Sequence, residues 1–203
     1  SDPALAAARG AARMSTSLRS GLGSVRGTDP MTKVRVPYPT TSDSFPRRLA
    51  SLAQLIELGL PLKCVSVDAN GGYDTHDDQL GTLPGDIGLL SQTLSAFQAD
   101  LEARGVADRV VVHVWSEFGR RAEENGGGTD HGAGGVSLIM GTQASGNVVG
   151  EFTGLAQLDD GNLRHSTDFR AVYKTLLEGW FGVDATDIVP DAGTFSALPL
   201  LRA

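Results

Sequence analysis

The chain has 203 residues, which is enough for one domain with a real hydrophobic core. Its net charge of −7 and pI near 5.0 argue against nucleic acid or an anionic membrane surface as a partner, because both attract clustered Lys and Arg. No apolar stretch approaches the roughly 20 residues that a membrane-spanning helix requires. The single cysteine, Cys64, excludes an intramolecular disulfide, and its apolar neighbours predict a small buried core residue.

The N-terminal part of the chain predicts two helices separated by a loop. Residues 4–22 are rich in Ala, Arg and Ser and predict a weakly amphipathic helix, and residues 23–41 indicate a loop. Residues 44–58 predict a second helix, in which Ser44 is the cap, Pro46 lies in the first turn and leucines form an apolar stripe. We therefore divide the chain into an N-terminal helix and loop, residues 1–41, and a domain that covers residues 42–203.

From residue 63 onward, short apolar runs alternate with helical patterns. The apolar runs predict buried strands over 63–67, 109–115 and 136–140, and the helical patterns cover 86–104 and 167–181. Gly105 is the expected C-cap of the first of these helices. In the last helix, Thr167 or Asp168 is the expected cap and Phe169 is expected to face inward. This alternation predicts an α/β fold with three α/β/α layers and a mostly parallel sheet. Three strands make a thin sheet, so we expect further strands from sequence before residue 1 or from a partner.

Polar clusters follow the expected strands, where ligands bind in open α/β sheets. Asp74 and His76 are one residue apart and point the same way if the segment is extended, whereas Asp130 and His131 are adjacent in a glycine-rich loop. Carboxylate and imidazole together are typical ligands of zinc, manganese or iron, whereas calcium and magnesium prefer oxygen alone. The alternative is that these are turn residues, with Asp capping backbone N–H groups and His exposed.

Further polar residues follow the second expected strand. Glu117 should point into the same crevice, with a salt bridge to Arg120 or Arg121 as the alternative role. The two arginines are suited either to holding a phosphate or sulfate group or to a solvated loop edge. His113, inside the strand, is expected to be a core histidine.

Three stretches carry a family resemblance: GGYDTHDDQ (71–79), DRVVVHVWSEFGRRAEENGGGTDHG (108–132) and TDFRAVYKTLLEGWFG (167–182). Over roughly residues 45–200 the chain resembles the bacterial family called domain of unknown function 1501. That family is placed in the superfamily of alkaline phosphatases, sulfatases and phosphoglycerate mutases, whose members bind two divalent ions beyond a parallel sheet. The resemblance implies an alkaline phosphatase-like fold that is incomplete at its N-terminus, in a protein exported to the periplasm or the extracellular space.

The resemblance also implies roles for individual residues. Asp74, His76 and His131 resemble the ligands of one metal, and Glu117 and Asp130 are further ligands or orienting partners. Phe118 stands where the superfamily has a ligating His, so the second metal site is weakened or lost. An alternative alignment places Asp130 and His131 at that position instead. The nucleophile of the superfamily would precede residue 1, so the resemblance assigns none here.

The expected function is a metal-dependent hydrolase of phosphate or sulfate esters, with a divalent ion (zinc, manganese or calcium) as cofactor. Its expected substrate is a small-molecule or glycan ester, and its expected partner is a missing N-terminal half or a second subunit. The alternative is a non-catalytic exported scaffold or binding protein that retains the fold. In a third interpretation, the polar clusters are turn residues without a ligand.

Overall fold

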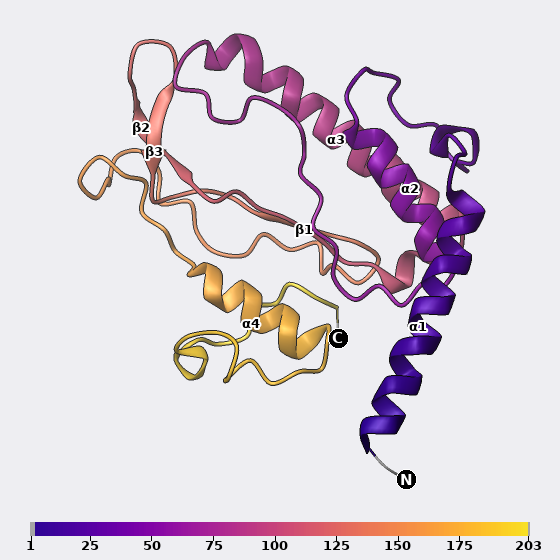
Figure 1. Ribbon diagram of the computed structural model, residues 1–203. Coiled ribbons are helices and arrows are strands. Elements are labelled where there is room, and N and C mark those ends of the chain that lie inside the picture. Colours follow the sequence, from indigo (N-terminus) through magenta and orange to yellow (C-terminus); the bar gives the residue numbers. More distant parts are fainter. Residues whose placement is uncertain (1–2, 203) are drawn as a thin grey trace. The chain divides into compact units, whose positions relative to one another are not determined.

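The computed structural model describes residues 3–202 and divides into two compact units. The first unit comprises the residues up to 73 together with 82–107, and the second comprises residues 74–81 together with those from 108 onward. The elements in chain order (Figure 1) are α1 (Pro3–Val25), η1 (Pro30–Thr32), α2 (Phe45–Glu57), α3 (Gln79–Ala103), η2 (Ala107–Arg109), β1 (Val112–Val114), β2 (Gly119–Glu124), β3 (Thr129–Gly132), β4 (Leu138–Met140), α4 (Phe169–Gly179) and η3 (Ala192–Thr194).

The first unit is helical. The helices predicted over residues 4–22, 44–58 and 86–104 all form, as α1, α2 and α3. Ser44 precedes α2, but its side chain forms no capping bond; the carboxylate of Asp43 accepts the N–H of Phe45 instead, at 2.6 Å. Helix α3 begins at Gln79, earlier than the predicted residue 86, and runs through Pro84 near its start. It ends before Gly105, whose φ of +68° suits the expected glycine at a helix C-terminus.

The core of the first unit combines apolar side chains with a buried ionic network. Apolar side chains of α2 and α3 are buried, among them Leu49, Ala53, Phe97 and Leu101. The buried carboxylate of Asp100 accepts hydrogen bonds from the Arg35 N–H (2.7 Å), the Tyr38 hydroxyl (3.2 Å) and Arg104 Nε (3.0 Å). The guanidinium of Arg104 also contacts Glu57 of α2. The network therefore links α2, α3 and the loop that contains Arg35 and Tyr38.

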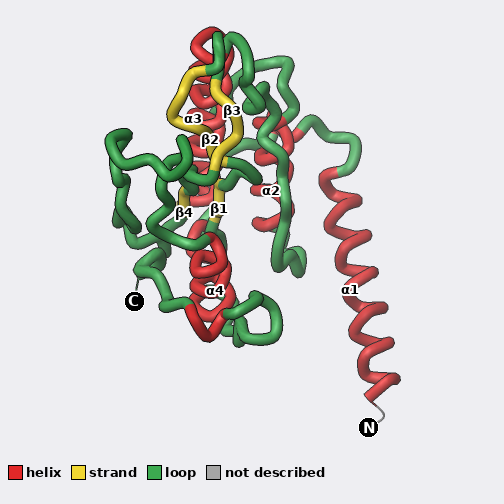
Figure 2. Tube along the Cα trace, turned by 90° about the vertical axis from the view of Figure 1, so that its left-hand side faces the viewer, coloured by secondary structure: helices red, strands yellow, loops and turns green. Residues whose placement is uncertain are grey.

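The predicted parallel sheet is wrong. Within residues 3–202, the strands form two separate antiparallel pairs, β1 with β4 and β2 with β3, and no parallel pair is present (Figure 2). The three-layer α/β/α fold and its alkaline phosphatase-like sheet are therefore not supported. The segment 63–67 forms no strand, and Cys64, predicted to be buried, is exposed.

The connections between strands explain this difference. Adjacent parallel strands need a crossover, which is usually a helix. Here β1 and β4 are joined through the β2–β3 hairpin, so the chain returns in the opposite direction and pairs antiparallel. The hairpin itself was not predicted, because β2 has the polar sequence Gly-Arg-Arg-Ala-Glu-Glu and lacks an apolar alternation.

Helix α4 and the segment after it form the small core of the second unit. The Asp168 carboxylate accepts the Arg170 N–H at 2.8 Å, which confirms the predicted cap. Phe169 is 67% exposed, so its predicted inward orientation is wrong. Burial instead involves Ala185, Val189 and Ala192, against which Leu177 of α4 packs. In the described part of the chain, no helix is long and apolar enough to cross a membrane.

Candidate metal centre

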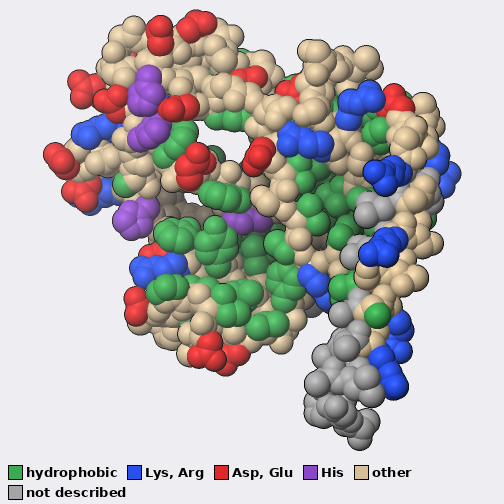
Figure 3. All heavy atoms as spheres, viewed as in Figure 1, with side chains coloured by type: hydrophobic (Ala, Val, Ile, Leu, Met, Phe, Trp, Pro, Cys, Tyr) green, Lys and Arg blue, Asp and Glu red, His purple; other side chains and the backbone are tan. Residues whose placement is uncertain are grey.

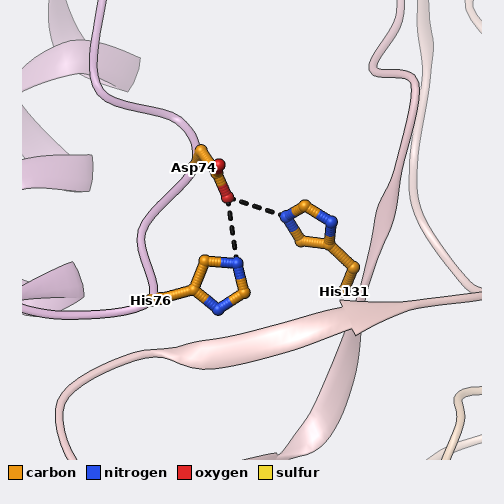
Figure 4. Close-up of side chains that lie close together, drawn as sticks. All are labelled: Asp74, His76 and His131. Carbon is orange, nitrogen blue, oxygen red and sulfur yellow. Dashed lines mark hydrogen bonds and ion pairs between the residues drawn. The ribbon is translucent and has the colours of Figure 1, made fainter.

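Three predicted ligands meet in the second unit, and we call them the Asp74–His76–His131 cluster. Asp74 and His76 lie in the segment before α3, and His131 lies on β3 (Figure 4). Oδ1 of Asp74 is 2.7 Å from Nε2 of His131 and 3.1 Å from Nε2 of His76. One donor atom from each residue lies within 4.8 Å of the others. The structure thus brings together residues that are 57 positions apart in the chain.

A close approach of two backbone segments positions the cluster. The turn of the β2–β3 hairpin packs against residues 75–79, with a hydrogen bond of 2.9 Å from Gln79 N to Gly127 O. A Cβ atom at Gly128 would lie 2.3 Å from the Thr75 carbonyl oxygen, which is far inside van der Waals contact. Only glycine therefore permits this approach at position 128.

Arg120 of β2 joins the same two segments through its side chain. Its Nη1 donates to the Thr129 carbonyl at 2.6 Å, and its Nη2 donates to the Thr75 hydroxyl at 3.2 Å. Nη2 is also 3.9 Å from Oδ1 of Asp74. Arg120 is paired with His131 across the hairpin, so its guanidinium lies beside the cluster. The sequence suggested either an anion-binding role or a solvated loop edge for Arg120. In the structure its guanidinium links the segment that contains Thr75 to the segment that contains Thr129.

Asp130 lies next to His76 and outside the cluster of three donors. Its Oδ1 accepts a hydrogen bond of 2.7 Å from Asn125 Nδ2 and is 3.4 Å from Nδ1 of His76. The imidazole of His76 is therefore held between Asp74 at Nε2 and Asp130 at Nδ1. This is the position of a carboxylate that orients a metal-ligating histidine from behind.

Glu117 is placed differently from the other predicted ligands. Its side chain is exposed, and it is not among the donors that converge in the described part of the chain. Arg121, four residues further along the chain, donates to the Asp160 carbonyl at 2.6 Å. The structure thus gives no support to Glu117 as a ligand of this cluster.

The ring of Phe118 covers one face of His131. The two ring centroids are 3.8 Å apart and the planes differ by 8°, so the rings are stacked. The guanidinium of Arg120 lies 5.0 Å from the centroid of the same phenyl ring. Sequence reasoning noted Phe118 only as a missing ligand. Its contact with His131 depends on the hairpin register, which the sequence did not reveal.

The cluster is open to solvent, and its one carboxyl group, that of Asp74, is ionised. The side chains of Asp74, His76 and His131 are 64%, 46% and 43% exposed, and Figure 3 shows histidine and acidic side chains gathered at the surface. The hydrogen bond from His131 lowers the pKa of Asp74, and the charges of His131, His76 and Arg120 add to this effect. Asp74 is therefore ionised at neutral pH, as a metal-ligating carboxylate must be.

The donor set can be tested against the geometry of a bound ion. Ligand atoms about 2.0–2.2 Å from zinc, at tetrahedral angles, lie roughly 3.3–3.6 Å from one another. The two distances from Asp74 Oδ1, 2.7 and 3.1 Å, are somewhat shorter, so these side chains would have to move slightly apart to hold such an ion. Two imidazoles and one carboxylate fit zinc, manganese or iron, whereas calcium takes six to eight oxygens. The residues present therefore fit a transition-metal ion better than calcium.

Comparison with known protein families assigns the chain to one of them. The profile described as "Protein of unknown function (DUF1501)" matches residues 3–189. This match extends further toward the N-terminus than the resemblance that starts near residue 45, and so includes α1. No curated protein and no solved structure matches the chain. The chain thus belongs to the DUF1501 family of proteins of unknown function.

Proposed function

We propose that the Asp74–His76–His131 cluster binds one divalent transition-metal ion, with zinc and manganese as the first candidates, and that the site hydrolyses phosphate or sulfate esters. The observation that carries the proposal is the convergence of one carboxylate and two imidazoles from two separate segments of the chain. Kinship with the alkaline phosphatase and sulfatase superfamily is part of the same proposal. It is supported by the residues that converge and receives no support from the strand topology.

Each side chain has a separate role in the proposed site. Asp74 would supply an ionised oxygen, and His76 and His131 would supply their Nε2 atoms, which face that oxygen and would be deprotonated when a metal binds. Oδ1 of Asp130 lies 3.4 Å from Nδ1 of His76, where it would favour the tautomer that keeps its proton on Nδ1 and leaves Nε2 to ligate. A divalent ion would supply Lewis acidity to an ester oxygen and to an attacking water. Hydrolysis would add water across the P–O or S–O bond of the ester, and the products would be an alcohol and phosphate or sulfate.

The solvent exposure of the cluster leaves a path for an ester to reach it. All three side chains are at least 43% exposed, so a small or a bulky alcohol group has access to the donors from solvent. This is consistent with a small-molecule or glycan ester as substrate. The nucleophile is left to water in this proposal, because the cluster itself consists of one carboxylate and two imidazoles.

The test combines metal binding with hydrolysis. We expect the purified chain to bind Zn²⁺ or Mn²⁺ and to show a raised melting temperature on metal addition, because a ligand of the native state stabilises it. We expect the metal-loaded protein to hydrolyse an aryl phosphate or an aryl sulfate, and a chelator to abolish that activity. A protein that neither binds these ions nor is stabilised by them would contradict the proposal.

A matched pair of variants assigns the activity to the cluster. His131→Ala should abolish the metal-induced rise in melting temperature and the hydrolysis together. His165→Ala removes another exposed imidazole, outside the cluster, and should change neither measurement. If both variants lost metal stabilisation and hydrolysis equally, any surface histidine would suffice for these effects. That result would contradict a metal site formed by the Asp74–His76–His131 cluster.

A second function is favoured by the same exposure. Electrostatic stabilisation of a transition state is strongest where water is excluded, and these three side chains are open to solvent. A non-catalytic binding protein whose loops are held by a metal is therefore the alternative. It predicts metal binding and stabilisation that depend on His131, without hydrolysis of either ester. The hydrolysis assay on metal-loaded protein decides between the two functions.

A further inference from the structure

We infer that Phe118 is a positioning residue of the metal centre, which fixes the plane of the His131 imidazole so that its Nε2 faces Asp74. The inference rests on the proposed metal site and deepens it. It starts from the stacking of the two rings, whose centroids are 3.8 Å apart and whose planes differ by 8°. The other end of the His131 ring contacts Asp74, with 2.7 Å between Nε2 and Oδ1.

Stacking restricts the motion that would most easily misalign this ligand. The χ2 torsion of histidine joins an sp³ to an sp² carbon and has a broad energy profile, so an exposed imidazole turns readily about it. Rotation about χ2 would swing the His131 ring out of its plane and into the phenyl ring that lies 3.8 Å away. Phe118 therefore blocks this rotation on one face of the imidazole. The His131 side chain is then already ordered before metal binding, so less conformational entropy is lost when the ion binds.

Phe118 is itself held in place by a chain of contacts. The guanidinium of Arg120 lies 5.0 Å from the phenyl centroid, within the range of a cation–π interaction. That guanidinium donates to the Thr129 carbonyl and to the Thr75 hydroxyl. Thr75 lies between Asp74 and His76, so the same contacts reach the segment that carries the other two ligands. The phenyl ring is thus fixed relative to all three donors.

Each histidine of the cluster then has its own orienting partner. Asp130 contacts Nδ1 of His76, and Phe118 covers a face of His131. A phenyl ring contributes no donor atom, so this side of the site adds orientation and leaves three protein ligands for one ion. We expect one ion per chain at saturation, with the remaining coordination positions open to water or substrate.

Titration of the full chain with Zn²⁺ alone tests the inference in three variants of Phe118. Phe118→Ala removes the stacked ring, and we expect it to weaken Zn²⁺ binding by about tenfold or more, the usual effect of losing an orienting partner. Phe118→Leu keeps apolar bulk without a ring and should also weaken binding. Phe118→Tyr keeps the ring and should restore the wild-type affinity.

Two further measurements separate positioning from general stability. The visible absorption of bound Co²⁺ reports the geometry of its ligands, and we expect it to change in Phe118→Leu and to be retained in Phe118→Tyr. The melting temperature without metal shows how far each variant is folded. If Phe118→Ala fails to fold, the comparison of the leucine and tyrosine variants decides, because both keep a large apolar side chain.

The outcomes also distinguish this inference from the proposed function. Wild-type affinity and an unchanged Co²⁺ spectrum in Phe118→Leu would overturn the role of Phe118, while the metal site itself would stand. Wild-type protein that binds neither Zn²⁺ nor Co²⁺ would overturn both. Loss of binding in Phe118→Leu and Phe118→Tyr alike would show that the ring is not what matters, and would also overturn the inference.

Discussion

Ionic side chains gather in both units of this molecule, but their solvent exposure differs. In the first unit, the side chains of Asp100 and Arg104 are 0% and 1% exposed, and Asp100 accepts three hydrogen bonds. In the second unit, the Asp74 side chain is 64% exposed, and its histidine partners are nearly half exposed. The same kinds of charged contact are therefore made in two very different surroundings.

The difference teaches which contacts serve the fold and which serve another purpose. Breaking a buried ion pair leaves one charge buried without a partner and costs several kcal/mol. The contribution of such a pair to stability is therefore a sufficient reason for its presence. An exposed ion pair contributes about 0–1 kcal/mol. Stability therefore gives a weak reason for two imidazoles to converge on Asp74, and ligand binding gives a better one.

The largest expected effect is the loss of the buried charge in the first unit. Asp100→Asn removes the negative charge beside Arg104 and leaves that guanidinium buried with one fewer anionic partner. We expect the free energy of unfolding to fall by about 3–5 kcal/mol, the usual cost of breaking a buried pair. Urea unfolding followed by circular dichroism measures it.

The matched control is the same substitution in the exposed cluster. In the absence of metal, Asp74→Asn should change the free energy of unfolding by about 0.5 kcal/mol or less, because a surface site away from a core feature contributes little. Similar losses in the two variants would erase the contrast between the units and would mean that the cluster is part of the structural framework.

A second prediction concerns Asp130, which should affect metal binding and leave the fold intact. Asp130→Ala removes the carboxylate that faces Nδ1 of His76, so the ring is no longer oriented from behind. We expect Zn²⁺ affinity to fall about 10–100-fold, as measured by competition with a chromogenic chelator. Glu123→Ala, which removes an exposed carboxylate of β2, should leave the affinity unchanged. An equal effect in the two variants would indicate a diffuse charge effect.

The cluster was more predictable from sequence than the fold. Asp74 and His76 share a face because they are one residue apart, and this local relation needs no knowledge of strand pairing. The family resemblance grouped His131 with them, and the structure brings the three side chains together although the expected sheet edge is not formed. Phe118, Arg120 and Asn125 acquire their contacts from the hairpin register, so their roles could not be inferred from the residues alone.

The failure of the fold prediction has a similar physical origin. Apolar runs indicate burial without stating the direction in which a strand pairs, and the run at 63–67 forms no strand at all. The antiparallel pairing of Val112–Val114 with Leu138–Met140 follows from what lies between them, a hairpin of polar residues. Helices were predicted better, because their caps and apolar stripes are local; Asp168 and Gly105 are two examples.

A third, smaller effect is expected at the α4 cap in the second unit. Hydrogen bonds from the Arg170 side chain and backbone lower the pKa of Asp168. The ionised cap is therefore more favourable in the folded state, and its contribution is present above the unfolded pKa of about 4 and lost as the pH falls through the folded value. Asp168→Ala should cost about 1 kcal/mol at pH 7, measured by urea unfolding. The difference from wild type should shrink toward pH 3; a constant difference would rule out the charge as its source.

An effect of similar size is expected in the buried network of the first unit and concerns alkaline pH. Burial raises the pKa of Tyr38, and the charge of Asp100 raises it further. The folded state therefore keeps this phenol neutral, and its contribution is full below the unfolded pKa of about 10 and is lost as the pH rises above it. Tyr38→Phe removes this ionisation together with one hydrogen bond to Asp100, so it should cost about 1 kcal/mol at pH 8. The wild type should then lose stability more steeply than the variant between pH 8 and about pH 10.5. Parallel pH profiles of the two proteins in urea unfolding would show that Tyr38 ionises equally easily in both states, and hence that the network does not exclude water from its hydroxyl.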